Sequence, residues 1–168
     1  LAYGRLLARA GSWDACHEVM SQLVAASPDN VALVTTWCEM QLERGEAGNV
    51  ETLLRDLDEN DPSVKRARAR LFALTDRTDR AVELVRSLVP PKDAENRIAG
   101  VVSLARFLEE IKLEEEAERF YRAAAESRPE LQLEVAAFLA RSGRLNEALA
   151  LCDAPVSNPT LVAGSRIG

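Results

Sequence analysis

Apolar residues recur three and four positions apart along most of the chain, with charged residues between them. In the segment from 97 to 111, for example, Val101, Leu104 and Leu108 would share one face of a helix. The same spacing predicts ten helices, joined in pairs by short turns: 1–10 with 13–26, 31–44 with 49–58, 63–74 with 79–88, 97–111 with 114–127, and 131–141 with 146–153. The pattern therefore predicts an all-α protein built from helical hairpins.

Glycine and proline punctuate these pairs at a shared interval. Gly11 and Gly45 are 34 residues apart (45 − 11), and so are Pro28 and Pro62 (62 − 28). Proline suits a first helical turn and disfavours continuation of the helix before it, and Ser12 is expected to cap the helix that follows it. The chain is thus predicted to consist of repeated units, with bounds near 1–27, 28–61, 62–92, 93–129 and 130–154.

The repeat length varies along the chain. Aligning Cys16, Val50, Ala81, Ala117 and Ala148 gives steps of 34, 31, 36 and 31 (50 − 16, 81 − 50, 117 − 81, 148 − 117), so insertions are expected in the loops. The segment 155–168 could begin a further helix at Asn158-Pro159 or form a tail. Both ends of the chain look cut from a longer polypeptide.

The fourth pair resembles the tetratricopeptide repeat. It reads Val101-x2-Leu104-Ala105-x2-Leu108, then Ala117-x3-Tyr121, then Pro129. The family pattern has large and small residues at these places on the first helix, a small residue and an aromatic on the second, and a closing proline. Two helices that cross closely need a small residue at the contact, with larger residues beside it.

The other pairs repeat this logic with variations, and the resemblance covers residues 1–154. The small residues on successive first helices are Gly4, Cys38, Ala69, Ala105 and Ala136. Val50 replaces the small residue on one second helix, and the third and fifth units lack the proper closing proline. The resemblance implies a right-handed α-α superhelix of about five tetratricopeptide-like units. A helical-hairpin solenoid with less regular stacking is the alternative.

Composition and charge narrow the classes of partner. Hydrophobic residues make up 47% of the chain and aromatics 5%, which is typical of closely packed helices. The net charge of −6, from 27 acidic and 21 basic residues, argues against nucleic acid and against an acidic membrane surface. No apolar run reaches the roughly 18 to 20 residues that cross a bilayer. Cys16, Cys38 and Cys152 are expected to be buried free thiols, so we predict a cytoplasmic protein.

No pattern of residues indicates catalysis. His17 is the only histidine, and adjacent helical residues such as Cys16 and His17 point about 100° apart, so the two would not bind one metal. No Gly-x-Ser-x-Gly elbow and no glycine-rich phosphate loop is present. We therefore predict that the chain is not an enzyme and that it binds no metal and no cofactor. Its many carboxylates are expected to lie on solvated faces.

Arginines on the first helices are the candidate binding residues, because the resemblance implies that these helices line the concave surface. Arg66 and Arg70 are four apart and share a helix face. Arg106 and Arg5 occupy the equivalent register in other units, and Glu39 fills it in the second unit. Such a groove could receive an acidic peptide or a terminal carboxylate. The alternative is that Arg66 and Arg70 lie on the wet side of an ordinary soluble helix.

The lysine and asparagine that bind a chaperone tail in some members of this family are missing. Leu1, Arg5 and Thr36 stand at the corresponding places, so binding of a chaperone tail is not predicted. The predicted function is a non-catalytic scaffold that binds a protein or peptide in its concave groove. The alternatives are a structural module that forms homo-oligomers through the ends of its array, and a regulatory appendage of an enzyme whose catalytic domain lies outside this segment.

Overall fold

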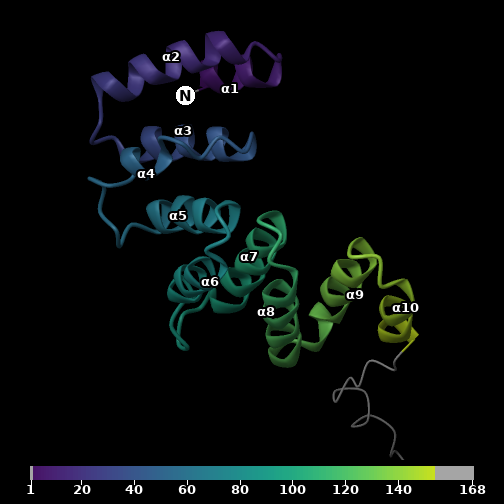
Figure 1. Cartoon of the computed structure of the whole chain (residues 1–168). Coiled ribbons are helices and arrows are strands. Elements are labelled where there is room, and N and C mark those ends of the chain that lie inside the picture. Colours follow the sequence, from purple (N-terminus) through teal and green to yellow (C-terminus); the bar gives the residue numbers. More distant parts are fainter. Residues whose placement is uncertain (1, 154–168) are drawn as a thin grey trace, which may run out of the picture. The chain divides into compact units, whose positions relative to one another are not determined.

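The computed structural model describes residues 2–153, and these residues form helices and turns without a strand (Figure 1). Segment 155–168, for which a further helix or a tail was predicted, lies outside the described residues. The elements are α1 (Ala2–Arg9), α2 (Trp13–Ala26), α3 (Val31–Glu43), α4 (Val50–Leu53), α5 (Pro62–Leu74), α6 (Thr78–Ser87), α7 (Arg97–Glu110), α8 (Glu114–Ser127), the 3-10 turn η1 (Pro129–Leu131), α9 (Gln132–Arg141) and α10 (Leu145–Asp153). The all-α prediction is confirmed.

Each odd-numbered α-helix packs with the even-numbered helix that follows it, and one left-handed residue lies in each connecting turn. These residues have φ between 57° and 79°, and they are Gly11, Gly45, Asp76, Lys112 and Gly143. They recur at steps of 34, 31, 36 and 31 (45 − 11, 76 − 45, 112 − 76, 143 − 112). The same steps separate the aligned residues on the second helices, so each turn has a fixed position relative to its hairpin.

Proline begins α5 as predicted. Asp61 precedes Pro62 and caps the helix, because its Oδ1 accepts hydrogen bonds from the backbone nitrogens of Ser63 at 2.7 Å and Val64 at 3.3 Å. The prediction for Ser12 is wrong in part. Ser12 occupies the N-cap position of α2, but its side chain makes no capping hydrogen bond.

The second helix of the second pair is much shorter than predicted. A helix over 49–58 was expected, and α4 ends at Leu53 after one turn. The segment that follows is rich in Asp and Asn, whose side chains compete for backbone hydrogen bonds. Asp58 Oδ1, for example, accepts a hydrogen bond from the backbone nitrogen of Asn60 at 2.9 Å. Leu54 nevertheless stays buried, so the chain keeps its contact with the core.

The small residues of the repeat lie at helix contacts. Cys38, Ala69, Ala105 and Ala136 are all buried. Gly4 is buried too, and a Cβ atom there would lie 2.5 Å from Sδ of Met20. A side chain at position 4 would therefore require the buried side chain of Met20 to move. Of the predicted buried thiols, Cys16 and Cys38 are buried, but Cys152 is exposed because no described element covers its side of α10.

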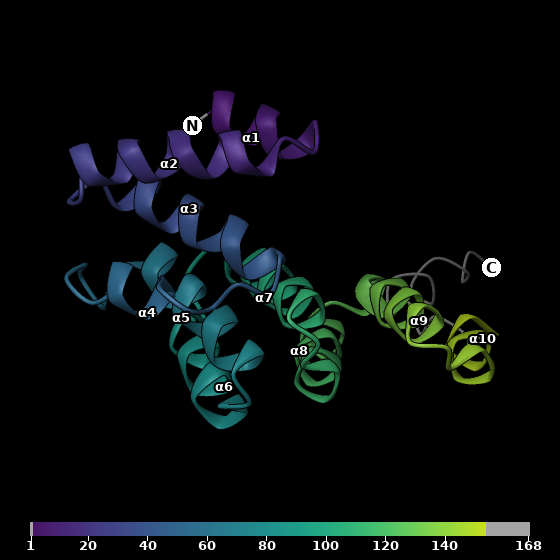
Figure 2. The same cartoon turned by 45° about the horizontal axis from the view of Figure 1, so that its top comes forward.

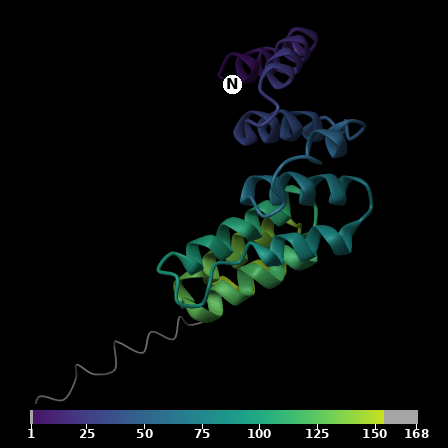
Figure 3. The same ribbon diagram turned by 90° about the vertical axis from the view of Figure 1, so that its left-hand side faces the viewer.

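The helices form two compact units, Leu1–Leu88 (unit 1) and Val89–Gly168 (unit 2). In unit 1, α3 lies between the α1–α2 pair and α5, and Figures 2 and 3 show these helices stacked in chain order. The core of this unit includes Met20, Trp37 and Leu54. In unit 2, the α7–α8 and α9–α10 pairs pack through α8 and α9, and Tyr121 and Phe138 are buried with ring centroids 5.2 Å apart.

Candidate functional site

Three first helices of unit 1 carry four of the five predicted binding residues. Arg5 lies on α1, Glu39 on α3, and Arg66 and Arg70 on α5. On α5, the buried residues Val64, Ala67 and Leu71 pack inward, and Arg66 and Arg70 are half-buried beside them. We call Arg5, Glu39, Arg66 and Arg70 the first-helix face of unit 1.

The carboxylate of Glu39 lies within electrostatic reach of all three arginines. Burial raises the pKa of Glu39, and the negative charge of Glu43 adds to this rise. Arg70 opposes the rise most strongly, followed by Arg5 and Arg66. The first-helix face therefore surrounds one carboxylate with positive charge from helices on both sides of it.

A hollow of about 260 Å³ adjoins this face between α1 and α3. Its lining residues are Arg5, Ala8, Arg9, Thr36, Glu39, Met40 and Glu43. This volume lies just below the roughly 300 Å³ at which small-molecule sites begin, so the hollow suits a single side chain. Sequence reasoning missed Arg9 and Glu43, although each lies four residues after a predicted site residue and so shares its helix face.

The fifth predicted residue, Arg106, belongs to α7 in unit 2. Its Nη2 donates a hydrogen bond to Glu134 Oε1 on α9 at 3.1 Å, although its side chain remains 58% exposed. Nearby, Arg141 donates to Glu109 from Nε at 2.7 Å and from Nη2 at 2.9 Å. These hydrogen bonds hold the pKa of Glu109 below its usual range. The charges on this side of unit 2 thus join one hairpin to the next.

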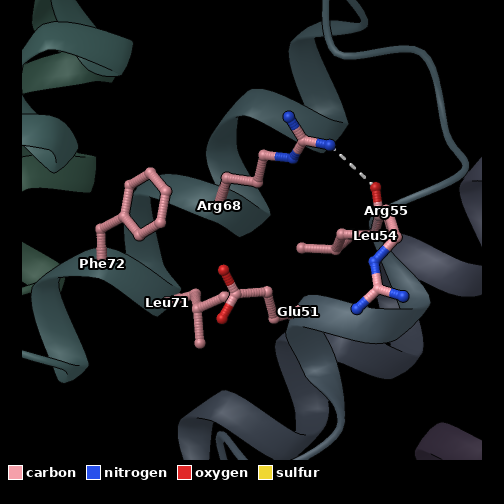
Figure 4. A pocket seen from close by; sticks show the side chains of 6 residues that line it. All are labelled: Glu51, Leu54, Arg55, Arg68, Leu71 and Phe72. Carbon is pink, nitrogen blue, oxygen red and sulfur yellow. Dashed lines mark hydrogen bonds between the residues drawn. The ribbon is translucent and has the colours of Figure 1, made fainter.

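A second hollow of unit 1, about 280 Å³, lies between α4 and α5 (Figure 4). It exists because α4 is only one turn long and covers little of α5. Arg68 Nη2 reaches across it and donates a hydrogen bond to the carbonyl oxygen of Leu54 at 3.0 Å. In a longer helix, this carbonyl oxygen would accept a backbone hydrogen bond instead. Beside it, Arg77 lies over the ring of Phe72 at 4.4 Å and contacts Glu51 at 3.4 Å. Arg68 and Arg77 are thus already engaged within the fold.

Within residues 2–153, no group of three or more His, Cys, Asp or Glu side chains is placed to hold a metal ion. His17 is exposed, and it contacts the ring of Trp37 edge-on at 5.2 Å. In the same part of the chain, no helix is both long and apolar enough to cross a membrane.

Known proteins give one informative comparison. The sequence matches no protein-family model, and no curated protein is significantly similar to it. The structure is similar to a solved structure, the crystal structure of MamA, with a TM-score of 0.53 and 13% sequence identity. The match covers 88% of this chain and 89% of the other. This similarity supports an all-helical repeat fold.

Proposed function

We propose that this chain is a non-catalytic interaction scaffold of the tetratricopeptide type, and that its first-helix face in unit 1 binds an acidic segment of a partner protein. Helical repeats of this kind present long surfaces to other polypeptides. Buried free thiols at Cys16 and Cys38 suit a reducing compartment, so we propose that the scaffold works in the cytoplasm.

The observation that carries this proposal is the placement of Glu39. Three guanidinium groups and the carboxylate of Glu43 act on the carboxylate of Glu39, so basic side chains outnumber acidic ones around it in a chain whose net charge is −6. Arginine binds carboxylates through paired hydrogen bonds, so the arginines around Glu39 offer a binding surface for further acidic side chains. The adjoining hollow would receive one side chain of the same segment.

We propose Arg106 as a further binding residue, which lies in unit 2. Binding of a partner carboxylate there would have to replace the existing hydrogen bond to Glu134. We therefore expect this hydrogen bond to reduce the contribution of Arg106 to affinity.

The test compares two variants of the first-helix face, one that removes positive charge and one that removes negative charge. With a labelled hexaglutamate peptide, R66A/R70A should weaken binding about tenfold, since each exposed ion pair contributes about 0.2–1 kcal/mol. E39Q should strengthen binding, because it removes the carboxylate that competes for the same arginines. Fluorescence anisotropy at low and high salt would measure both effects, and salt should weaken the binding.

A matched control is R55A/R80A, which removes the same charge from exposed positions outside the first-helix face. This variant should bind the peptide almost as the unchanged chain does. The proposal would be rejected if R66A/R70A and R55A/R80A lost affinity equally, or if E39Q weakened binding while circular dichroism showed an intact fold.

A further inference from the structure

The hollow between α1 and α3 has one basic wall and one acidic wall. Arg5 and Arg9 line it from α1, and Glu39 and Glu43 line it from α3. The two residues of each pair are four positions apart, so they lie on the same face of their helix. Within residues 2–153, no hydrogen bond or ion pair joins these arginines to these glutamates. The two walls therefore present opposite charges to whatever enters the hollow.

The acidic wall favours a cation. Burial raises the pKa of Glu39, and the like charge of Glu43 raises it further, although arginines of α1 and α5 oppose the rise. A ligand cation between the two carboxylates would offset both effects, because an opposite charge stabilises the ionised form of a carboxyl group. The α3 side of the hollow is thus a place for a basic side chain of a partner.

The apolar lining of the hollow favours lysine as this side chain. Met40 and Ala8 line the hollow together with Thr36, and Met40 and Thr36 are buried. Lysine can place its aliphatic stem along apolar surface while its ammonium group remains in a polar environment. Its stem would therefore lie against Met40 and Ala8.

On the other side of α3, α5 carries a third charged pair. Arg66 and Arg70 are also four residues apart, and both act electrostatically on Glu39. Helix α3 packs against α5, and the axes of directly packed helices lie about 8–10 Å apart. The first helices of unit 1 thus carry basic, acidic and basic pairs in chain order, on α1, α3 and α5.

We infer that the partner segment bound by unit 1 carries an acidic, a basic and an acidic residue in turn, each separated from the next by two other residues. Three residues of an extended chain span about 10 Å, which matches the spacing of neighbouring helices. The acidic residues meet the arginines of α1 and α5, and a central lysine enters the hollow at Glu39 and Glu43. This inference rests on the proposed function and specifies the charge pattern of its partner.

The test uses two peptides of the same composition with blocked termini. In Glu-Ser-Gly-Lys-Ser-Gly-Glu, the order of charges matches the three helices. In Lys-Ser-Gly-Glu-Ser-Gly-Glu, two of the three charged residues meet a like charge, whichever way the peptide lies. Fluorescence anisotropy at low salt should show about tenfold tighter binding of the matching peptide, because each mismatch replaces an exposed ion pair by repulsion.

A variant of the acidic wall gives shifts of opposite sign. E39Q/E43Q should weaken binding of the matching peptide, because it removes the two partners of the lysine. The same variant should strengthen binding of hexaglutamate, which has no lysine. The matched control is E18Q/E83Q, which removes the same charge from exposed positions on second helices. It should leave the affinity ratio of the two ligands unchanged.

Equal binding of the two peptides would overturn the inference, and so would an unchanged affinity of E39Q/E43Q for the matching peptide while circular dichroism shows an intact fold. If R66A/R70A still weakened hexaglutamate binding in that case, the proposed function would stand and only the charge pattern would be rejected. Hexaglutamate binding that does not depend on Arg66 and Arg70 would remove the proposed function, and this inference with it.

Discussion

At the residue scale, Cys16 and Cys38 act as small apolar side chains at helix contacts. Cys16 is fully buried, and its Sγ donates a hydrogen bond to the carbonyl oxygen of Gly4 at 3.3 Å. Burial, aided by the negative charge of Glu39, raises the pKa of the Cys38 thiol to about 12. Such thiols are inert because the thiolate, which is the nucleophile, hardly forms.

These environments predict a clear order of thiol reactivity. At about pH 8, a disulfide reagent should label Cys152 at once and Cys16 and Cys38 at least about 100-fold more slowly. In denaturant, all three should react alike. Since an unfolded thiol ionises near pH 8.5, the contribution of Cys38 to folding stability should fall as the pH rises from there toward about 12. Fast native labelling of C16S/C152S, whose remaining thiol is Cys38, would contradict this account.

At the scale of the element, the turn inside each hairpin has one demanding position. Its residue has a positive φ, which is about 1–2 kcal/mol unfavourable for residues with a side chain. Glycine meets this requirement at Gly11, Gly45 and Gly143, whereas Asp76 and Lys112 adopt the same conformation with a side chain. The recurrence of this conformation at all five turns indicates that the hairpin geometry, rather than the local residue, imposes it.

The turns therefore offer stabilising substitutions. K112G should raise the free energy of unfolding by about 1 kcal/mol, and D76G by less, because aspartate tolerates positive φ better than lysine. G45A should lower it by about 1 kcal/mol. The matched control is G48A, where an added Cβ meets no atom within 4 Å. Urea unfolding would measure all four, and equal losses in G45A and G48A would show that φ is not the cause.

Unit 2 shows how neighbouring hairpins are held together. Glu109 on α7 accepts two hydrogen bonds from Arg141 on α9 and one from Tyr121 on α8. Its carboxylate therefore links α7 and α8 to α9. The hydrogen bond from Arg141 is the largest of the influences that lower the pKa of Glu109. This interaction should stabilise the unit at neutral pH and be lost as the pH falls through the depressed pKa.

At the scale of the whole molecule, each unit has its own buried core. Trp37, Met20 and Leu54 lie in the core of unit 1, and Tyr121, Phe138 and Leu139 are buried in unit 2. A core of this kind can hold its helices without the rest of the chain. The loop from Val89 to Asn96, which begins unit 2, is the natural place to divide the protein.

We expect residues 1–88 and 89–168 to fold as separate polypeptides. Their circular dichroism spectra should sum to that of the intact chain, because the division leaves each core whole. A division between Asp61 and Pro62 is the control, since it separates α3 from α5, which pack together in unit 1. That second pair of fragments should lose helix content. Equal helix content in both experiments would mean that single hairpins, not the units, are the folding elements.

The sequence by itself determined the local features of this protein. These features depend on interactions between residues close in the chain or on strict spacing. They are the helix pairs, the turns at Gly11 and Gly45, the proline start of α5 and the small residue at Ala105. The grouping of Arg5, Glu39, Arg66 and Arg70 on successive first helices could be anticipated for the same reason, because a repeat returns the same register to the same side.

Only the tertiary structure decided which of these groups meet a partner. The hydrogen bond between Arg106 and Glu134 joins residues that are far apart in the chain. The exposure of Cys152 depends on which of the described elements pack against α10. The apolar pattern of α10 would suit a core or a contact surface equally well. Spacing tells which residues share a helix face, but burial depends on what packs against that face, and this is a property of the folded chain.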